Sequence, residues 1–440
     1  MESILAIDAG TTSSRTIAFN RKIEQLAISQ FEFKQIFPKK SWVEHDPNEI
    51  WETQLKAIKE VLKSDKIDLE KIKSIGITNQ RETTVIWNRE SGKPIYNAIV
   101  WQDRRTAQIC ENLSNQTAIF VEKTGLVLDA YFSGTKVKWI LDNVEDAREL
   151  ANQGKLAFGT IDTWLIWKLT KGKVHVTDVT NASRTLLFNI NTLKWDDELL
   201  GILNIPKELL PKVVSSSEII GYTDLSLFGR KIPISGIAGD QQSALFGQMC
   251  INEGDVKNTY GTGCFCIMNT GNKVIKSKNR MLSTVAWKLN NEVTYALEGS
   301  VFIAGALVQW LRDELNIIKS ASEIENLAKQ VDDNGGITFI PALSGLGAPY
   351  WNPNTTGTIF GLTRDSNKSH IARAALEAIA LRSREIIIEM QKDAGFEFAE
   401  LKVDGGASKN NLLMQIQADL LNKDVVRSKS PESTALGAAF

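Results

Sequence analysis

Short apolar runs that end in polar residues alternate along the chain with longer stretches of helical periodicity. Residues 73–80, KSIGITNQ, have the pattern of a strand that leads into polar residues. Residues 162–169 and 371–395 have the pattern of helices, and we expect Asp162 or Thr163 to cap the first of them. The alternation of strand-like and helical segments favours an α/β architecture.

Two distant segments share one plan, a strand followed by a turn of glycine and hydroxyl residues and then a second strand. The first is ILAIDAGTTSSRTIAFN (4–20) and the second is KNTYGTGCFCIMN (257–269). This internal similarity predicts two similar halves. We place their boundary at residue 247, so that residues 1–247 form an N-terminal domain and residues 248–440 a C-terminal one.

The last ten residues, PESTALGAAF, predict a short helix that Ser433 or Thr434 can cap. The sequence stops at Phe440 after barely two helical turns, and a helix this short is marginal on its own. We therefore expect that the chain is cut short of its natural end and that the C-terminal domain is truncated.

Composition narrows the class of protein. Among 440 residues, 51 Lys and Arg nearly balance 52 Asp and Glu, so no net charge favours binding to nucleic acid or to an anionic membrane. The first apolar run is too short for a signal peptide, and no stretch approaches the roughly 18 apolar residues of a membrane span. Four cysteines are too few for a disulfide framework, so we expect a reduced, cytoplasmic protein.

Several common kinds of functional site are disfavoured. The sequence has no GxxxxGK[ST] loop and no GxGxxG after a strand. His45, His175 and His370 lie far apart without metal-ligand spacing, which disfavours zinc and a Ser-His-Asp triad. Cys264 and Cys266 are explained by alternate positions on a strand better than by a metal site.

Three turns rich in glycine and hydroxyl side chains remain: GTTSS (10–14), GTG (261–263) and DGGASKNN (404–411). Backbone N–H groups in such turns form concavities that bind anions, and small residues let phosphate oxygens approach closely. Asp8 stands before the first turn and Asp404 begins the third. A single turn of this kind is usually an ordinary turn, whereas three in one chain favour a nucleotide ligand.

Seven segments carry a resemblance to a known family. They are ITNQRETT (77–84), AIVWQDRRT (98–106), YFSGTKVKWIL (131–141), DTWLIWKLT (162–170), ISGIAGDQQSALFGQ (234–248), NTYGTGCF (258–265) and LSGLGAPYWNP (343–353). Together they resemble the FGGY carbohydrate kinases, and RET with YFSGTK is similar to the branch whose acceptor is glycerol. The family belongs to the superfamily of sugar kinases, hexokinase and actin. The resemblance therefore implies an α/β fold of two ribonuclease-H-like domains that flank a nucleotide cleft.

The resemblance also implies an activity, the Mg²⁺-dependent transfer of a phosphoryl group from ATP to glycerol to give sn-glycerol 3-phosphate. In the family's pattern the polyol is held by Arg81, Glu82, Tyr131, Asp240 and Gln241. Trp101 and Phe265 would provide an apolar wall. Because neighbouring side chains on a strand point to opposite faces, Arg81 and Glu82 can meet one ligand only if a turn or bulge lies there.

Asp240 is the expected general base, since it stands where a strand ends and a helix begins. The alternative role of this aspartate is to cap the helix of residues 241–249, and the two roles are compatible.

The nucleotide is expected to contact both halves. In the family's pattern, phosphates are met by Thr11, Thr12, Ser13 and Arg15 from one side and by Thr262 from the other. Gly305 and Gln309 lie in VFIAGALVQW (301–310), which we expect to be a helix against the nucleotide, and Gly406 and Asn410 would border the adenosine. Asp8 would orient Mg²⁺ through water, because Mg²⁺ takes few carboxylates and keeps much of its hydration shell.

Two alternative functions stay open. One is a kinase of another small polyol or pentose, and the other is an actin-like nucleotide-binding protein without transfer activity. The abrupt end at Phe440 adds a third possibility, a remnant without catalysis. The expected partners are glycerol and ATP or ADP, with no nucleic acid and no membrane, and the resemblance implies a homodimer or homotetramer.

Overall fold

The computed structural model describes residues 2–352, 354–430 and 432–440. Pro353, which ends one family-like segment, and Pro431, which begins the last ten residues, lie outside the described residues. The chain forms two compact units. The first unit comprises Met1–Gly247, Thr284–Tyr295 and Thr434–Phe440, and the second unit comprises Gln248–Ser283 and Ala296–Ser433.

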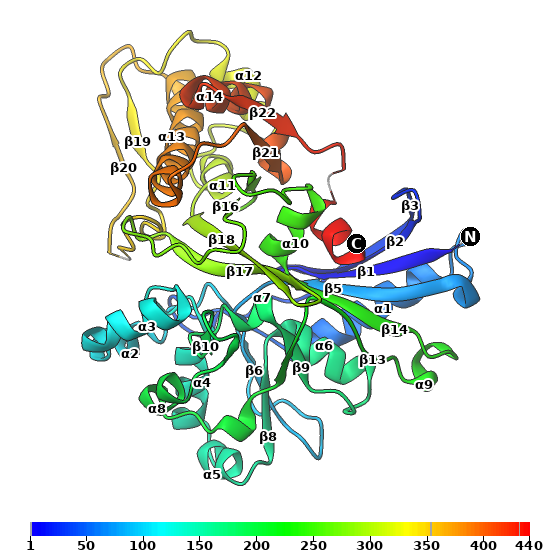
Figure 1. Cartoon of the computed structure of the whole chain (residues 1–440). Helices are drawn as coiled ribbons and strands as arrows, with labels where there is room; N and C mark the ends of the chain where they lie inside the picture. The colour runs from blue at the N-terminus through cyan, green and yellow to red at the C-terminus, as the bar shows by residue number, and fades with distance from the viewer. Residues whose placement is uncertain (1, 353, 431) are drawn as a thin grey trace. The chain divides into compact units, whose positions relative to one another are not determined.

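The first unit is built on a mixed sheet with strand order β13-β14-β5-β1-β2-β3 (Figure 1). The strand bounds are β1 Ser3–Ala9, β2 Ser13–Asn20, β3 Gln25–Glu32, β5 Ile72–Asn79, β13 Ser217–Tyr222 and β14 Pro233–Gly239. Strand β2 runs antiparallel to both β1 and β3, whereas β1, β5 and β14 run parallel to one another. The predicted strand at 73–80 is thus confirmed as β5.

Alternate residues of β1 face two different cores, which is why the strand is almost continuously apolar. Leu5 and Ile7 pack with helices α1 (Pro47–Leu62) and α6 (Ile161–Leu169). Ala6 faces the other way and packs with residues of the C-terminal helix. Figure 1 shows α1 and α6 on one face of this sheet and α10 and α15 on the other. A parallel strand covered on both faces has no need of a polar face.

Helices α10 (Asp240–Gly247) and α15 (Ser433–Ala439) cover the second face of the sheet. The Ser243 hydroxyl of α10 donates to the carbonyl oxygen of Thr434 at 2.7 Å, which ties the two helices together. The short helix predicted near the end of the sequence is therefore confirmed.

The carboxyl ends of three parallel strands lie side by side in the first unit. Ala9 of β1 is in register with Asn79 of β5, and Asn79 is in register with Gly239 of β14. In open α/β sheets ligands bind outside the carboxyl ends of the strands. The residues that follow these three positions are therefore the first place to look for a functional site.

The second unit repeats the same arrangement of strands, in the order β18-β16-β15-β21-β22 (Figure 1). The bounds are β15 Val256–Tyr260, β16 Cys264–Asn269, β18 Glu292–Val301, β21 Glu400–Asp404 and β22 Asp424–Arg427. The first three positions are antiparallel neighbours and the last three are parallel, as in the order β3-β2-β1-β5-β14. The prediction of an α/β chain with two similar halves is confirmed.

The core of the second unit lies around a long helix. Its helices are α11 Gly305–Asp313, α12 Glu323–Ala328, α13 Lys368–Ala394 and α14 Asn411–Leu421. Leu376 and Ile386 of α13 belong to its buried core, and Gly395 ends the helix with φ 76°. The helix predicted at 371–395 is confirmed and begins three residues earlier, where Asn367 caps it.

Two sequence-based expectations about helices are wrong. Residues 301–304 are not helical, because Val301 still belongs to β18 and α11 begins at Gly305. Helix α6 begins after Thr160, so Asp162 lies within its first turn instead of capping it. The Asp162 carboxylate is buried there and accepts hydrogen bonds from the hydroxyls of Thr160 and Thr177 (2.5 and 2.7 Å).

Strand β17 pairs with β13 in the large sheet, and the other remaining elements connect or flank the strands already described. Their bounds are β4 Glu44–His45, β6 Val85–Asn88, β7 Ala98–Ile99, α2 Ala107–Asn112, α3 Thr117–Thr124, α4 Ser133–Asn143, α5 Ala147–Asn152, β8 Leu156–Gly159, β9 Val176–Asp178, α7 Val179–Ala182, β10 Phe188–Asn189, β11 Lys194–Trp195, α8 Asp197–Leu203, β12 Lys212–Val214, α9 Leu225–Phe228, β17 Leu282–Leu289, β19 Thr338–Ile340 and β20 Thr358–Phe360.

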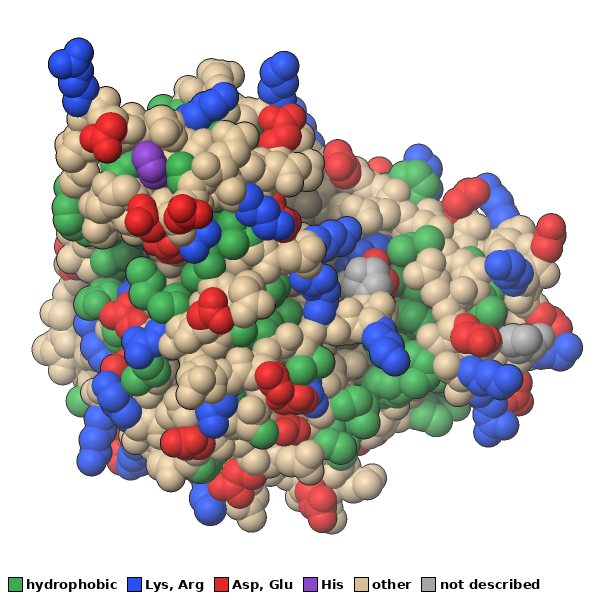
Figure 2. Space-filling model, turned by 90° about the horizontal axis from the view of Figure 1, so that it is seen from above, with side chains coloured by type: hydrophobic (Ala, Val, Ile, Leu, Met, Phe, Trp, Pro, Cys, Tyr) green, Lys and Arg blue, Asp and Glu red, His purple; other side chains and the backbone are tan. Residues whose placement is uncertain are grey.

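The surface and the titratable side chains agree with the balanced composition. Acidic and basic side chains are interspersed on the face that Figure 2 shows. The cysteines are free thiols, and Cys264 and Cys266 are buried on β16 at alternate positions, as expected. Among the described residues, no cluster of His, Cys, Asp and Glu is arranged to hold a metal ion. Within the same residues, no helix is long and apolar enough to cross a membrane.

Candidate active site

The β1–β2 turn of the first unit carries an ion pair at its base. Asp8 and Arg15 face each other in the strand register, and Arg15 Nη2 lies 2.5 Å from Asp8 Oδ2. The Asp8 side chain is almost fully buried and that of Arg15 is about a quarter exposed. The structure therefore gives Asp8 a cationic partner that the sequence interpretation, which assigned Asp8 to a metal, did not include.

The same turn is held from outside by long-range hydrogen bonds. The amides of Gln35 and Gln80 donate to the carbonyl oxygens of Thr11 and Gly10 at 3.2 and 3.0 Å. The Trp101 indole N–H donates to the Thr11 hydroxyl at 3.0 Å. These bonds anchor the turn to three other segments of the first unit.

Thr11, Thr12, Ser13 and Arg15 are brought together by this hairpin, as the sequence suggested. Thr12 is exposed, whereas Thr11 and Ser13 are half-buried. The Ser13 hydroxyl accepts a hydrogen bond from the Gln30 amide at 2.9 Å. A turn that presents small hydroxyl residues in this way is suited to an anion with several oxygen atoms.

Arg81 and Glu82 lie in the sharp turn that the sequence required. Strand β5 ends at Asn79, and Glu82 has φ 60°, a left-handed conformation that is uncommon for residues other than glycine. The hydroxyls of Thr84 and Ser133 donate to the Glu82 carbonyl oxygen at 3.1 and 2.9 Å. The turn is confirmed, and its backbone is held by neighbours from two other segments.

Arg81 contacts two side chains predicted to bind the same ligand, Asp240 and Tyr131, and a third, Gln242, that was not predicted. Its Nε lies 3.2 Å from Asp240 Oδ1, and its Nη2 donates to the Tyr131 hydroxyl at 3.4 Å. Its Nη1 donates to Gln242 Oε1 at 3.2 Å. The Arg81 side chain is 2 % exposed and that of Asp240 is 32 % exposed, so a buried cation holds a carboxylate that faces outward.

Asp240 also belongs to the first turn of α10, directly after Gly239. Its Oδ1 accepts a hydrogen bond from the backbone N–H of Gln241 at 2.8 Å, and the Gln241 side-chain amide lies 3.4 Å from Oδ2. An acidic group is stabilised at the beginning of a helix by the helix dipole. Asp240 thus lies inside the first turn of α10 instead of capping a helix that begins at residue 241, and its role as base stays a prediction.

Two residues of this group were not found from the sequence. Arg184 Nε donates to Glu82 Oε1 at 2.7 Å, and both side chains are buried. Gly239 has to be a glycine, because a Cβ there would lie 2.7 Å from Cδ of Arg81. The residues next to Arg184 and Gly239 in the sequence do not indicate these roles. Arg184 is 102 residues from its partner Glu82, and the need for a glycine at 239 arises only from its contact with Arg81 in the folded chain.

Tyr131 is positioned by the buried side chain of Lys136. Lys136 Nζ donates to the Tyr131 carbonyl oxygen at 2.5 Å and to that of Phe132 at 3.3 Å. Burial lowers the pKa of Lys136 to about 8. The Tyr131 ring meets the Trp101 ring edge to face, with 5.7 Å between their centroids. Trp101 therefore contacts both the aromatic group and the β1–β2 turn.

The second unit contains a cavity of about 420 Å³ that brings together all five residues predicted there. Thr262, Gly305, Gln309, Gly406 and Asn410 all line it. The rest of its lining is mostly apolar, with Tyr260, Val308, Ile324, Leu376 and Leu413 among its residues. An apolar pocket of this size with a few polar groups is typical of a site for a small organic ligand.

The GTG turn and helix α11 form one side of this cavity. The Gly305 N–H donates to the Gly261 carbonyl oxygen at 3.0 Å, and a Cβ at position 305 would lie 2.5 Å from that oxygen. The glycine in this helix is thus explained by close backbone contact. Asn410 caps α14 by accepting a hydrogen bond from the Leu413 N–H.

Phe265 is the remaining predicted contact. It lies on β16 of the second unit, half-buried, in register with Thr259 on one side and Ser300 on the other. Its role as an apolar wall for the acceptor stays a prediction.

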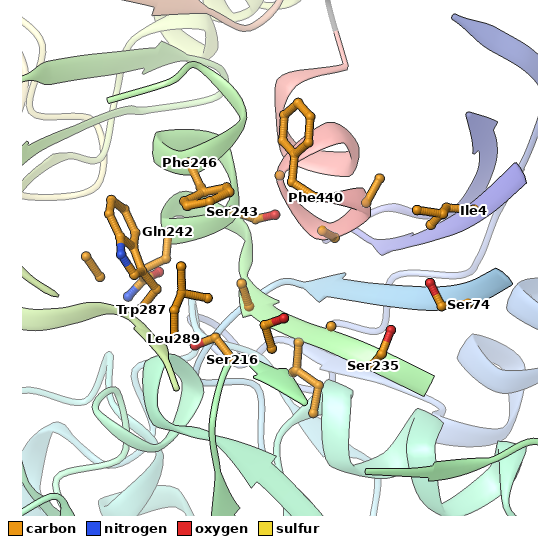
Figure 3. Close-up of a pocket in the computed structure, with 18 of the residues that line it drawn as sticks. Ile4, Ser74, Ser216, Ser235, Gln242, Ser243, Phe246, Trp287, Leu289 and Phe440 are labelled. Carbon is orange, nitrogen blue, oxygen red and sulfur yellow. The ribbon is translucent and has the colours of Figure 1, made fainter. Parts of the chain in front are cut away.

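A cavity of about 330 Å³ in the first unit is lined by different residues (Figure 3). Ser216, Gln242, Phe246, Trp287 and Phe440 are among them. Among the described residues that line it, none is a predicted contact of acceptor or nucleotide. The predicted site residues of the first unit therefore lie at the strand ends and do not line this cavity.

Comparisons with known proteins agree with this arrangement. Residues 3–247 match the N-terminal domain of the FGGY family of carbohydrate kinases, and residues 256–440 match its C-terminal domain. A glycerol kinase from Dichelobacter nodosus is 58% identical over 439 residues, which cover 99% of this chain and 88% of the relative. One from Borrelia duttonii is 59% identical over 443 residues, covering 100% of this chain and 89% of the relative. The crystal structure of Plasmodium falciparum glycerol kinase with ADP is similar at a TM-score of 0.92 and 39% identity, covering 100% of this chain and 88% of that one.

The buried Arg184–Glu82 pair generates a prediction about stability. Arg184→Met should lower the free energy of unfolding by about 3 kcal/mol or more, because it leaves a buried carboxylate without one of its cationic neighbours. Urea unfolding followed by tryptophan fluorescence measures this loss. Arg148→Met is the control, since Arg148 and its partner Asp142 lie at the surface and such pairs contribute about 1 kcal/mol or less. Equal losses in the two variants would contradict the importance of the buried pair.

Proposed function

The chain belongs to the FGGY family of carbohydrate kinases, and we propose that it transfers the γ-phosphoryl group of ATP to glycerol, giving sn-glycerol 3-phosphate. The observation that carries this proposal is the buried Arg81 guanidinium, which holds the outward-facing Asp240 carboxylate beside Tyr131 at the carboxyl edge of the sheet. We assign acceptor and phosphate binding to residues 1–247 and nucleotide binding to residues 248–440.

The chemistry of the first-unit group suits a small polyol. Each hydroxyl of glycerol both donates and accepts hydrogen bonds, so its site needs charged donors and acceptors close together. Arg81 offers N–H donors, Glu82 offers carboxylate oxygens, and the Tyr131 hydroxyl does both. Gln241 adds an amide beside Asp240, and Trp101 presents an aromatic face to the carbon chain.

Asp240 acts as the general base in this proposal. It takes the proton of the terminal hydroxyl of glycerol while that oxygen forms a bond to the γ-phosphorus of ATP and the bond to the leaving ADP oxygen breaks. Its partial exposure gives it access to a substrate, and its contact with Arg81 fixes its direction. The Gln241 N–H and the Arg81 Nε both lie at Oδ1, and we assign the proton transfer to Oδ2, which the Gln241 side-chain amide contacts at 3.4 Å.

The nucleotide is assigned to two sets of residues. We propose that the adenosine binds in the cavity of the second unit, bordered by Gln309, Gly406 and Asn410. The phosphates are assigned to Thr262 and to the hydroxyl-rich β1–β2 turn, where Arg15 adds a positive charge.

Asp8 is the proposed metal-orienting residue. A single hard carboxylate at the end of β1 fits Mg²⁺, which takes one or two carboxylates, several waters and the phosphate oxygens of its substrate. When bound, Mg²⁺ would neutralise charge on the transferring phosphoryl group. Asp8 would act on it through water, since its Oδ2 is already paired with Arg15.

The acceptor specificity can be tested by measuring ADP release with glycerol, dihydroxyacetone, xylulose and no acceptor. We expect the highest kcat/KM with glycerol, because the relatives that match nearly the whole chain at 58–59% identity are named glycerol kinases. Faster release with xylulose would support the alternative of a pentose kinase. ADP release that is independent of any acceptor would contradict transfer altogether.

Asp240→Asn tests the proposed base directly. The variant should lose about 10² to 10⁴ in kcat, the usual contribution of a general base, while its affinity for ATP is unchanged. Kinetics and calorimetric titration with ATP measure the two effects. Asp224→Asn is the matched control, because Asp224 also accepts a backbone N–H at the start of a helix, α9. A kcat for Asp240→Asn close to that of the control would remove Asp240 from the role of base.

A further inference from the structure

The buried carboxylate of Asp178 is connected by hydrogen bonds to the proposed acceptor site without being one of its contacts. Asp178 is the last residue of β9 and the N-cap of α7, and its side chain is fully buried. Oδ1 accepts hydrogen bonds from the Thr180 hydroxyl (2.8 Å) and from the backbone N–H and side-chain amide of Asn181 (both 3.0 Å). Oδ2 accepts one from the Ser216 hydroxyl at 2.8 Å. Every one of these bonds needs Asp178 as an acceptor.

One branch of this network reaches the residue before Asp240. The Thr180 hydroxyl donates to Asp178 and accepts a hydrogen bond from the backbone N–H of Gly239 at 2.8 Å. Gly239 ends β14, and Asp240 follows it directly. The bond therefore fixes the last peptide of β14, and only the two backbone torsions of Gly239 separate that peptide from Asp240.

The second branch reaches the residue before Arg81. Asn181 and Asn79 exchange two side-chain hydrogen bonds, of 3.0 and 3.2 Å. The Asn79 amide also donates to the carbonyl oxygen of Gln80 at 2.9 Å. Gln80 precedes Arg81 and the left-handed Glu82. All of these side chains are buried, so water does not compete for the bonds.

We propose that Asp178, Thr180 and Asn181 are positioning residues of the acceptor site, an inference that rests on the proposed function. Thr180 sets the position of Asp240, and Asn181 sets the turn of Arg81 and Glu82. A site of this kind works only within narrow limits, because a displacement of about 1 Å can cost as much as a hundredfold in rate. Asp178 joins the two branches, so that the base and the acceptor-binding pair are held by one buried group.

A second buried aspartate provides a comparison. Asp162 is also fully buried and also accepts a hydroxyl bond from a threonine two residues away, Thr160. Burial raises the pKa of both carboxyl groups, to about 7 for Asp162. The Thr160–Asp162 pair thus resembles the Thr180–Asp178 pair in burial and chemistry. It differs in that the Thr180 hydroxyl also accepts the Gly239 N–H.

The test compares isosteric threonine variants. Thr180→Val should lower kcat for glycerol phosphorylation about tenfold or more, with little change in KM for glycerol. Thr180→Ser, which restores the hydroxyl, should regain most of the wild-type rate. Thr160→Val, the matched control, should keep the wild-type kcat even if its thermal midpoint falls as far. Asn181→Leu should instead raise KM for glycerol, since it loosens the turn of Arg81 and Glu82.

A readout that does not depend on activity accompanies the kinetics. Amide hydrogen exchange at Gly239 should accelerate in Thr180→Val and stay unchanged in Thr160→Val, because only the first variant removes its acceptor. Equal kcat in the two valine variants, or unchanged exchange at Gly239, would overturn the inference. A wild-type chain that phosphorylates no acceptor would contradict the proposed function, while the exchange experiment would still decide whether Thr180 holds Gly239.

Discussion

The register of three parallel strands is the constraint on which the first unit depends. Ala9, Asn79 and Gly239 are aligned by the backbone hydrogen bonds of β1, β5 and β14. The three strands end at the same edge of the sheet. The β1–β2 turn, the Arg81–Glu82 turn and Asp240 therefore become neighbours although they are far apart in sequence. A shift of one residue in any of these strands would turn its side chains to the opposite face of the sheet and separate the residues that now meet at this edge.

The side chains proposed to bind the acceptor are held by further residues that are not among the proposed contacts. Arg184 holds Glu82, Lys136 holds the backbone at Tyr131, and Gly239 leaves room for Arg81. Buried polar groups of this kind are costly unless every partner is present, and a complete set restricts the structure to one arrangement. In the first unit, buried polar groups thus surround Arg81, and Arg81 in turn contacts the partly exposed carboxylate of Asp240.

Local patterns in the sequence predicted much of this fold, and long-range pairing was beyond them. The strand-turn-strand segments and the helix around Leu376 and Ile386 were correct, because their hydrophobic spacing is set within a few residues. The prediction of a helix over 301–310 was wrong for its apolar first residues, because β18 extends to Val301 and an apolar strand end cannot be told from an apolar helix start by composition. The five residues of the second unit that the family resemblance predicted to contact a nucleotide line one cavity. Arg184 was missed because only the folded chain brings it to Glu82.

The central claim is that one rigid strand edge presents a single hydroxyl of the acceptor to a single base. Glycerol has two primary hydroxyl groups that differ only in their handedness within an asymmetric site, so the stereochemistry of the product reports directly on that claim. The decisive measurement is the enantiomeric composition of the glycerol phosphate formed with ATP, assayed with dehydrogenases specific for each enantiomer. We predict sn-glycerol 3-phosphate alone. A mixture of the sn-1 and sn-3 products would contradict the account, because it would mean that the acceptor is not held in one orientation.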